Sequence, residues 1–175
     1  MTNIHRERWD VRANPKGLVE FDVDAATEIE VGDLVWVLDN DARPASATSL
    51  WTGGLDGTQR ELAMRFAGIA MSAKSGTSAA GKVRVATRGT FSMPVDSAAA
   101  FEIGDLVKAV RDASNNYLLD QEVGKITGMP DPANADQGLA IGVVNKRYSV
   151  ATSIVEFDIC TKFAAGGGWK SFLTS

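Results

Sequence analysis

The chain contains two copies of one nineteen-residue pattern, and this repeat limits the folds that it can adopt. Residues 17–35 and 89–107 align without a gap at an offset of 72 residues. Nine of the nineteen aligned positions are identical: Gly17/Gly89, Val23/Val95, Asp24/Asp96, Ala26/Ala98, Glu30/Glu102, Gly32/Gly104, Asp33/Asp105, Leu34/Leu106 and Val35/Val107. A solenoid needs about three stacked units or more, so two copies are too few. The repeat instead predicts one domain built from two similar halves, related by an approximate twofold axis.

A second pair of matches extends the repeat beyond these segments. Phe66–Ala70 is similar to Leu139–Val143, and Val83–Thr87 is similar to Val155–Ile159. The predicted organisation is an N-terminal arm (1–16), a β-rich domain (17–160) with repeat halves 17–88 and 89–160, and a glycine-hinged C-terminal tail (161–175).

The hydrophobic periodicity is that of β-strands. Residues 19–23 alternate apolar and acidic side chains, which gives a strand one apolar and one polar face. The apolar runs 34–38 and 106–110 each follow a Gly-Asp pair, which favours a turn. Residues 58–65 combine helix formers without Gly or Pro and predict a short helix. The predicted class is all-β: a compact β-barrel or sandwich of two similar halves, with at most one or two short helices and extended terminal arms.

Composition predicts a compact soluble domain. The 175 residues are 45% apolar and 23% charged, which is ordinary for a globular protein with a substantial core. The net charge of −4 gives no global indication of nucleic-acid binding, for which a basic face would be expected, and no apolar run approaches the roughly 20 residues of a membrane span. Residues 1–10 lack the apolar stretch of a secretory signal. The residues expected in or near the core are Val35, Trp36, Ile69, Val107 and Ile141.

Motifs for nucleotide and metal binding are incomplete. Gly76–Lys82 matches the first seven positions of the phosphate-binding pattern GxxxxGK[ST], but Val83 replaces the hydroxyl residue and a strand is expected to follow. One His and one Cys cannot form a zinc site of the usual kind. Asp39–Asp41 lacks the Gly and the distal Glu of a calcium loop, so a turn is predicted there. The sequence thus predicts no cofactor and no metal.

The sequence also gives little indication of a catalytic site based on a nucleophile or on paired carboxylates. A catalytic triad would have to use His5, which lies in the predicted arm, and a general base needs a rigid setting. Carboxylate pairs such as Asp22 and Asp24 lie on one strand face and are expected to be solvated. The lone Cys160 follows a strand-like run and is predicted to be a small buried apolar side chain, in keeping with synthesis in a reducing compartment. We therefore expect no catalytic residue.

The two ends differ from the middle of the chain. Residues 1–16 hold four Lys or Arg against two acids, with Trp9 at the centre, and the tail places Trp169 and Phe172 after three glycines. One interpretation is a pair of frayed termini. The other is a pair of arms that dock on neighbouring subunits, because Trp is enriched among interface anchors. The candidate interface residues are Arg6, Arg8, Trp9, Arg12, Trp169 and Phe172.

The order of short glycine motifs resembles the small capsid decoration, or cement, proteins of tailed bacteriophages. The motifs are Gly-Asp-Leu-Val at 32–35, Phe-Ala-Gly-Ile-Ala at 66–70, Arg-Gly-Thr-Phe at 88–91, a second Gly-Asp-Leu-Val at 104–107 and Ala-Ile-Gly-Val-Val at 140–144. The resemblance covers roughly residues 17–160. It implies an all-β fold, no catalysis, and attachment to the outside of an icosahedral shell, commonly as a trimer. The arm and the tail are longer than the resemblance implies.

The leading hypothesis is a structural virion protein, made in the host cytoplasm, that binds the outer capsid surface and staples neighbouring major capsid proteins. Its expected partners are the major capsid protein and itself, as a trimer or a dimer, with no nucleic acid and no membrane. One alternative is a head-fibre base or a minor tail component. A further alternative, from another class, is a β-barrel enzyme or ligand-binding module.

Overall fold

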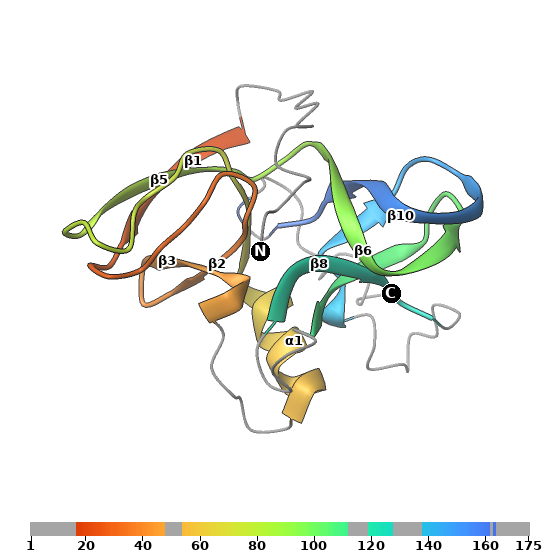
Figure 1. Ribbon diagram of the computed structural model, residues 1–175, viewed down its shortest axis with the longest axis horizontal. Helices are drawn as coiled ribbons and strands as arrows, with labels where there is room; N and C mark the ends of the chain where they lie inside the picture. The colour runs from red at the N-terminus through yellow and green to blue at the C-terminus, as the bar shows by residue number, and fades with distance from the viewer. Residues whose placement is uncertain (1–16, 48–53, 112–118, 128–137, 162, 164–175) are drawn as a thin grey trace, which may run out of the picture.

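Two closed five-stranded β-barrels make up the computed structural model of the chain (Figure 1). The structure describes residues 17–47, 54–111, 119–127, 138–161 and 163. Barrel 1 contains the strands of the first half, barrel 2 contains those of the second, and the helix lies beside the junction between them. The predicted all-β fold of two similar halves is confirmed, with each half closing into a barrel of its own.

Barrel 1 is closed in the order β1-β3-β2-β4-β5. Its elements are β1 (Leu18–Val23), β2 (Leu34–Leu38), β3 (Asp41–Pro44), the 3-10 turn η2 (Ala45–Ala47), the helix α1 (Gly54–Arg65), β4 (Phe66–Ala70) and β5 (Gly81–Ala86). β2 and β3 form a hairpin whose two loop residues, Asp39 and Asn40, both have positive φ (52° and 76°), as a type I′ turn requires. The predicted turn at 39–41 is therefore confirmed.

Barrel 2 is closed in the order β10-β6-β8-β7-β9. Its strands are β6 (Thr90–Phe101), β7 (Leu106–Arg111), β8 (Leu119–Lys125), β9 (Gly142–Val144) and β10 (Tyr148–Ile159). The order matches that of barrel 1 when β1 corresponds to β6, β2 to β7, β3 to β8, β4 to β9 and β5 to β10. The sequence repeat is thus a repeat of topology.

The strand register is also the same in the two barrels. Phe21 pairs with Val83 across β1 and β5, and Met93 pairs with Val155 across β6 and β10, each partner shifted by 72 residues. Just outside these strands, Thr87 N–H donates to Gly17 O at 2.7 Å, as Ile159 N–H does to Gly89 O at 3.0 Å. The predicted match of 83–87 with 155–159 is therefore correct.

The predicted match of 66–70 with 139–143 is wrong by one residue. On β2, Val35 pairs with Gly68, and on β7 the equivalent Val107 pairs with Gly142, so β4 corresponds to 140–144. Backbone proximity fixes this alignment. A Cβ at Gly68 would collide with the carbonyl oxygen of Ala86, and one at Gly142 would collide with the Phe157 ring and lie 2.8 Å from the carbonyl oxygen of Asp158. The two glycines, rather than the apolar residues around them, therefore define which residues of β4 and β9 are structurally equivalent.

The Gly-Asp pairs build one turn twice. Asp33 N–H donates to Glu30 O at 3.2 Å, and the Asp33 carboxylate accepts from Glu30 N–H at 2.9 Å. The corresponding bonds between Asp105 and Glu102 are 3.1 and 2.7 Å. The intervening glycines have φ of 102° and 94°, which favours glycine at the third position of a turn. The carboxylate and the glycine together explain why this motif is retained in both halves.

Helix α1 breaks the symmetry and fills the junction between the halves. It replaces the predicted helix at 58–65 with a longer one that begins at Gly54. Gln59 is 3% exposed and donates from Nε2 to Ala109 O on β7 at 2.7 Å. From the other half, Gln121 on β8 accepts from Leu34 N–H on β2 at 2.6 Å. Two amide side chains, the buried Gln59 and the partly buried Gln121, therefore hydrogen-bond the halves to one another.

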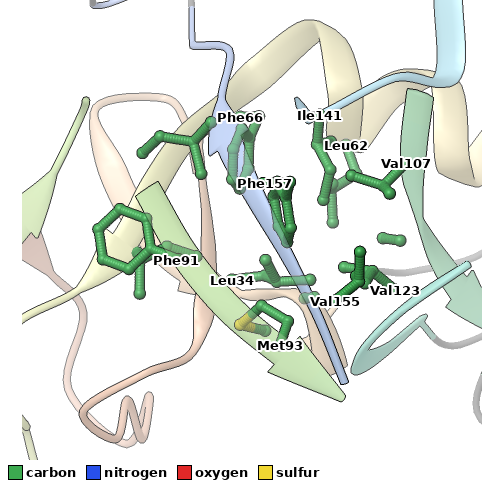
Figure 2. Close-up of a cluster of buried hydrophobic side chains, with 14 of the residues drawn as sticks. Leu34, Leu62, Phe66, Phe91, Met93, Val107, Val123, Ile141, Val155 and Phe157 are labelled. Atoms are coloured by element: carbon green, nitrogen blue, oxygen red, sulfur yellow. The ribbon is translucent and has the colours of Figure 1, made fainter. Parts of the chain in front are cut away.

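One hydrophobic cluster runs through barrel 2 and across this junction (Figure 2). Phe91, Met93, Val155 and Phe157 of barrel 2 belong to the same cluster as Leu34, Leu62 and Phe66 of the first half. A second cluster fills barrel 1, with Val35, Val83 and Val85 among its members. All five residues predicted to lie in or near the core are buried, at 0–1% exposure. Because the first cluster crosses the junction, we expect the barrels to unfold together.

Replacing Val107 by alanine is expected to lower the free energy of unfolding by about 1–3 kcal/mol, because removing its two methyl groups leaves a cavity in the core. Val107 is fully buried on β7, whereas the turn residue Val31 is 37% exposed. Val31→Ala is the matched control and should cost less than about 0.5 kcal/mol. Urea denaturation of both variants measures the difference, and equal costs would contradict the assigned core.

Candidate interaction surfaces

All six residues predicted to form an interface lie outside the described residues. They are Arg6, Arg8, Trp9 and Arg12 of the arm and Trp169 and Phe172 of the tail. These predictions therefore stay predictions. The structure does show the residues that join the barrels to the N-terminal and C-terminal segments.

The two ends of the described chain meet at one residue. Thr87 donates to Gly17 O from both its N–H, at 2.7 Å, and its hydroxyl, at 2.9 Å. The Thr87 carbonyl in turn accepts from the hydroxyl of Thr161 at 2.9 Å. Thr87 and Thr161 are 2% and 1% exposed, so this is a buried, well-packed junction. Gly17 and Thr161, at the two ends of the double barrel, therefore lie at the same place.

The segment that resembles a phosphate-binding loop has a different structure. Gly76–Ala80 is a loop with local hydrogen bonds among Ser75, Thr77 and Ser78, and the strand β5 begins at Gly81, as the sequence predicts. The Lys82 ammonium lies 2.9 Å from Glu20 and 3.9 Å from Asp22 on β1. The hydrogen bond and charge of Glu20, and then the charge of Asp22, raise the pKa of Lys82. This lysine is therefore bound to carboxylates on the barrel surface.

The acidic strand face is solvated and ion-paired. Asp22 is 68% exposed, and Asp24 is 57% exposed with its carboxylate 3.8 Å from Arg43. Across the described ranges, no group of three or more His, Cys, Asp or Glu is placed to hold a metal ion. The one α-helix in those ranges is also too short and too polar to cross a membrane.

Cys160 is half-buried, and not fully buried as the sequence predicted. Its sulfur lies 4.0 Å from the carbonyl oxygen of Asp158 at the end of β10. Burial, followed by the negative charge of Asp158, raises the pKa of the Cys160 thiol to about 11. Because the thiolate is the reactive form, this position gives a poor nucleophile.

The Cys160 thiol is expected to react about a hundredfold more slowly with a disulfide reagent at pH 8 in the folded protein than in the unfolded chain. The same shift affects stability. Because the pKa of the folded thiol is about 11, above that of a thiol in the unfolded chain, the neutral thiol stabilises the fold fully at pH values below the unfolded pKa. This stabilisation is lost as the pH rises towards 11. The chain has one cysteine, so the absorbance of the thiolate that the reagent releases measures the reaction of this site alone. Equal rates in the two states would contradict the raised pKa.

Barrel 2 carries a surface that the sequence analysis did not single out. Ser97–Phe101 of β6 and Tyr148–Ile154 of β10 contain no charged residue, and we call this two-stranded segment the neutral ribbon. Val150, at 76% exposure, and the adjoining turn residue Ile103, at 70%, are the most exposed large apolar residues described. The signal was present in the sequence as twelve strand residues without charge, in a chain that is 23% charged.

Comparison with known proteins places the chain in no family. No family model matches it, and no curated protein matches it either. Among solved structures, the head fiber gp8.5 N base of bacteriophage phi29 is similar at 11% identity and a TM-score of 0.40, over 81% of this chain and 93% of that one. A likeness at this level does not identify the partners of this chain.

Proposed function

We propose that this chain is a structural virion protein of a tailed bacteriophage, which binds the outer surface of the capsid and staples neighbouring major capsid proteins. The sequence motifs support this through their resemblance to capsid decoration proteins. The observation that carries the proposal is the buried junction at Thr87, from which the arm and the tail both leave a double barrel. Two adjacent segments can contact the same neighbouring subunit.

The physical demands of stapling fit this architecture. A cement protein needs a rigid body and multivalent contacts, and linked contacts on a repeating shell raise avidity without any single strong contact. The hydrogen-bonded junction between the halves supplies the rigid body. The arm carries a net charge of +2, from four Lys or Arg and two acids, so the rest of the chain carries −6. A basic arm on an acidic body is suited to an acidic neighbour.

Cryo-electron microscopy of the virion that carries this chain tests the proposal. We expect density for the double barrel at repeated sites on the outer shell. Density confined to a fibre base or to the tail would favour the alternative virion role, and absence of the chain from the virion would overturn both.

We also propose that the isolated protein neither catalyses a reaction nor binds nucleotide. The salt-bridged Lys82 and the absent hydroxyl at Val83 support this for the segment at 76–83. Calorimetric titration with ATP and Mg²⁺ should show no saturable heat. Binding with micromolar affinity would instead support the ligand-binding alternative.

A further inference from the structure

The neutral ribbon has an open strand edge. In the described part of the chain, β6 pairs with β8 at Val95 and β10 pairs with β9 only from Phe157 to Ile159. The ribbon strands therefore pair with each other, in an irregular register, and have no further strand partner there. On the β6 side, Lys125 Nζ donates to the carbonyl of Ala100 at 3.2 Å. The β10 side, along Ser149–Ser153, is the free edge.

Exposed edges are normally protected by charged side chains or proline, because unpaired backbone groups bind other strands. This edge has neither, and its exposed residues are small or apolar: Ser149, Val150, Ala151 and Ser153. Charged side chains lie at its Tyr148 end instead. Arg147 and Glu102 form an ion pair at 2.9 Å, and Lys146 lies 5.4 Å from the Tyr148 ring centre. An apolar centre with a charged rim is the usual anatomy of a protein interface.

The chain itself contains a segment of matching chemistry. Residues 164–175 read AAGGGWKSFLTS, with one charge in twelve residues and with Trp169, Phe172 and Leu173 as apolar anchors. The N-terminal arm fits the edge less well, because six of its sixteen residues are charged and would lose water on an uncharged surface. The tail is therefore the better complement.

The tail starts far from the ribbon of its own molecule. Phe163 packs against Phe21 of barrel 1, with ring centres 5.2 Å apart, whereas the ribbon is at the opposite end of barrel 2 (Figure 1). Trp169 is six residues beyond Phe163 and reaches about 20 Å at full extension. Ser153, the near end of the edge, is about 20 Å from Ile159 along β10, so a fully straight tail would bring Trp169 to that end at most and leave the rest of the edge uncovered by residues before Trp169. A neighbouring molecule can supply the tail without this restriction.

The geometry points to self-association in which residues 169–174 of one copy add as a strand to the Ser149–Ser153 edge of a second copy. Backbone hydrogen bonds supply affinity in such strand addition, and pockets for alternate side chains supply specificity. The contact joins two different surfaces, so it generates a closed ring if the rotation between copies closes. This inference does not rest on the proposed role in the virion.

Sedimentation equilibrium of the full chain tests the inference. The wild-type protein should associate reversibly, and a chain ending at Phe163 should be monomeric at the same concentrations. Val150→Asp should weaken association at least about tenfold, because it places an unpaired charge in the contact. Met64→Asp is the matched control, since Met64 is an apolar side chain with 54% exposure on α1, and it should leave association unchanged.

Disulfide trapping identifies the two surfaces directly. In a Cys160→Ser background, a chain with Ala151→Cys is mixed with a chain with Ser171→Cys, and a disulfide between the two chains is expected. Met64→Cys mixed with Ser171→Cys should give none. The inference is wrong if the wild type is monomeric, if the truncated chain or Val150→Asp associates like the wild type, or if no mixed disulfide forms.

Discussion

Alanine at Gly68 is expected to lower the free energy of unfolding by about 4 kcal/mol, more than alanine at the other glycines that the structure describes. Two costs combine there. Gly68 has φ of +139°, where an L-residue is strained by about 1–3 kcal/mol. Its Cβ would also collide with the carbonyl oxygen of Ala86 on β5, and overpacking of this kind costs about 1–3 kcal/mol.

Two further glycines separate these costs. Gly104 has φ of +94° with nothing within 4 Å of its Cβ position, so Gly104→Ala should show the backbone cost alone, about 1–2 kcal/mol. At Gly142, where φ is not positive, the Cβ would meet the Phe157 ring, so Gly142→Ala should show the packing cost alone. Chemical denaturation of the three variants measures the series. If Gly68→Ala were no worse than Gly104→Ala, the close approach of β4 and β5 would be wrong.

These glycines also show where sequence reasoning succeeded and where it slipped. The gapless match around Gly32-Asp33 and Gly104-Asp105 predicted the two halves correctly, because each residue there has a local task that its own sequence reveals. The match of 66–70 slipped by one, because apolar side chains are interchangeable in a core and aligned equally well in two registers. The constraint on Gly68 comes from Ala86, eighteen residues later, and such a contact is visible only in the folded chain.

The surfaces were harder to predict than the fold. Periodicity detects faces that alternate, and the neutral ribbon has no alternation of apolar and charged residues to detect. The junction at Thr87 is likewise invisible in sequence, because this threonine hydrogen-bonds both Gly17 and Thr161, which are far apart along the chain. Sequence reasoning chose Trp9 and Trp169 because both lie in terminal segments and tryptophan is enriched among interface anchors. The structure adds that the segments carrying them leave from one point, which makes a joint role in attachment physically reasonable.

Under the proposed role, deleting residues 1–12 is expected to weaken binding to shells strongly while leaving the double barrel folded, because the strands of both barrels come from residues 18–159. Within this segment the aromatic residue should matter most. Trp9→Ala should reduce affinity about thirtyfold, as loss of a buried anchor of about 2 kcal/mol would. Arg6→Ala should reduce it less than about fivefold, because a charge at the rim of an interface contributes mainly to the association rate.

Salt separates the two contributions. Raising the ionic strength screens exposed charges, so the effect of Arg6→Ala should shrink while that of Trp9→Ala persists. Binding of labelled protein to shells stripped of it, measured at low and high salt, gives both numbers, and circular dichroism verifies that each variant is folded. A chain ending at Phe163 is the control for avidity, because it should lose self-association but keep the arm. If the chain lacking residues 1–12 occupies shells as the wild type does, the arm takes no part in attachment, and the tail and the barrel surfaces must hold the protein to the shell.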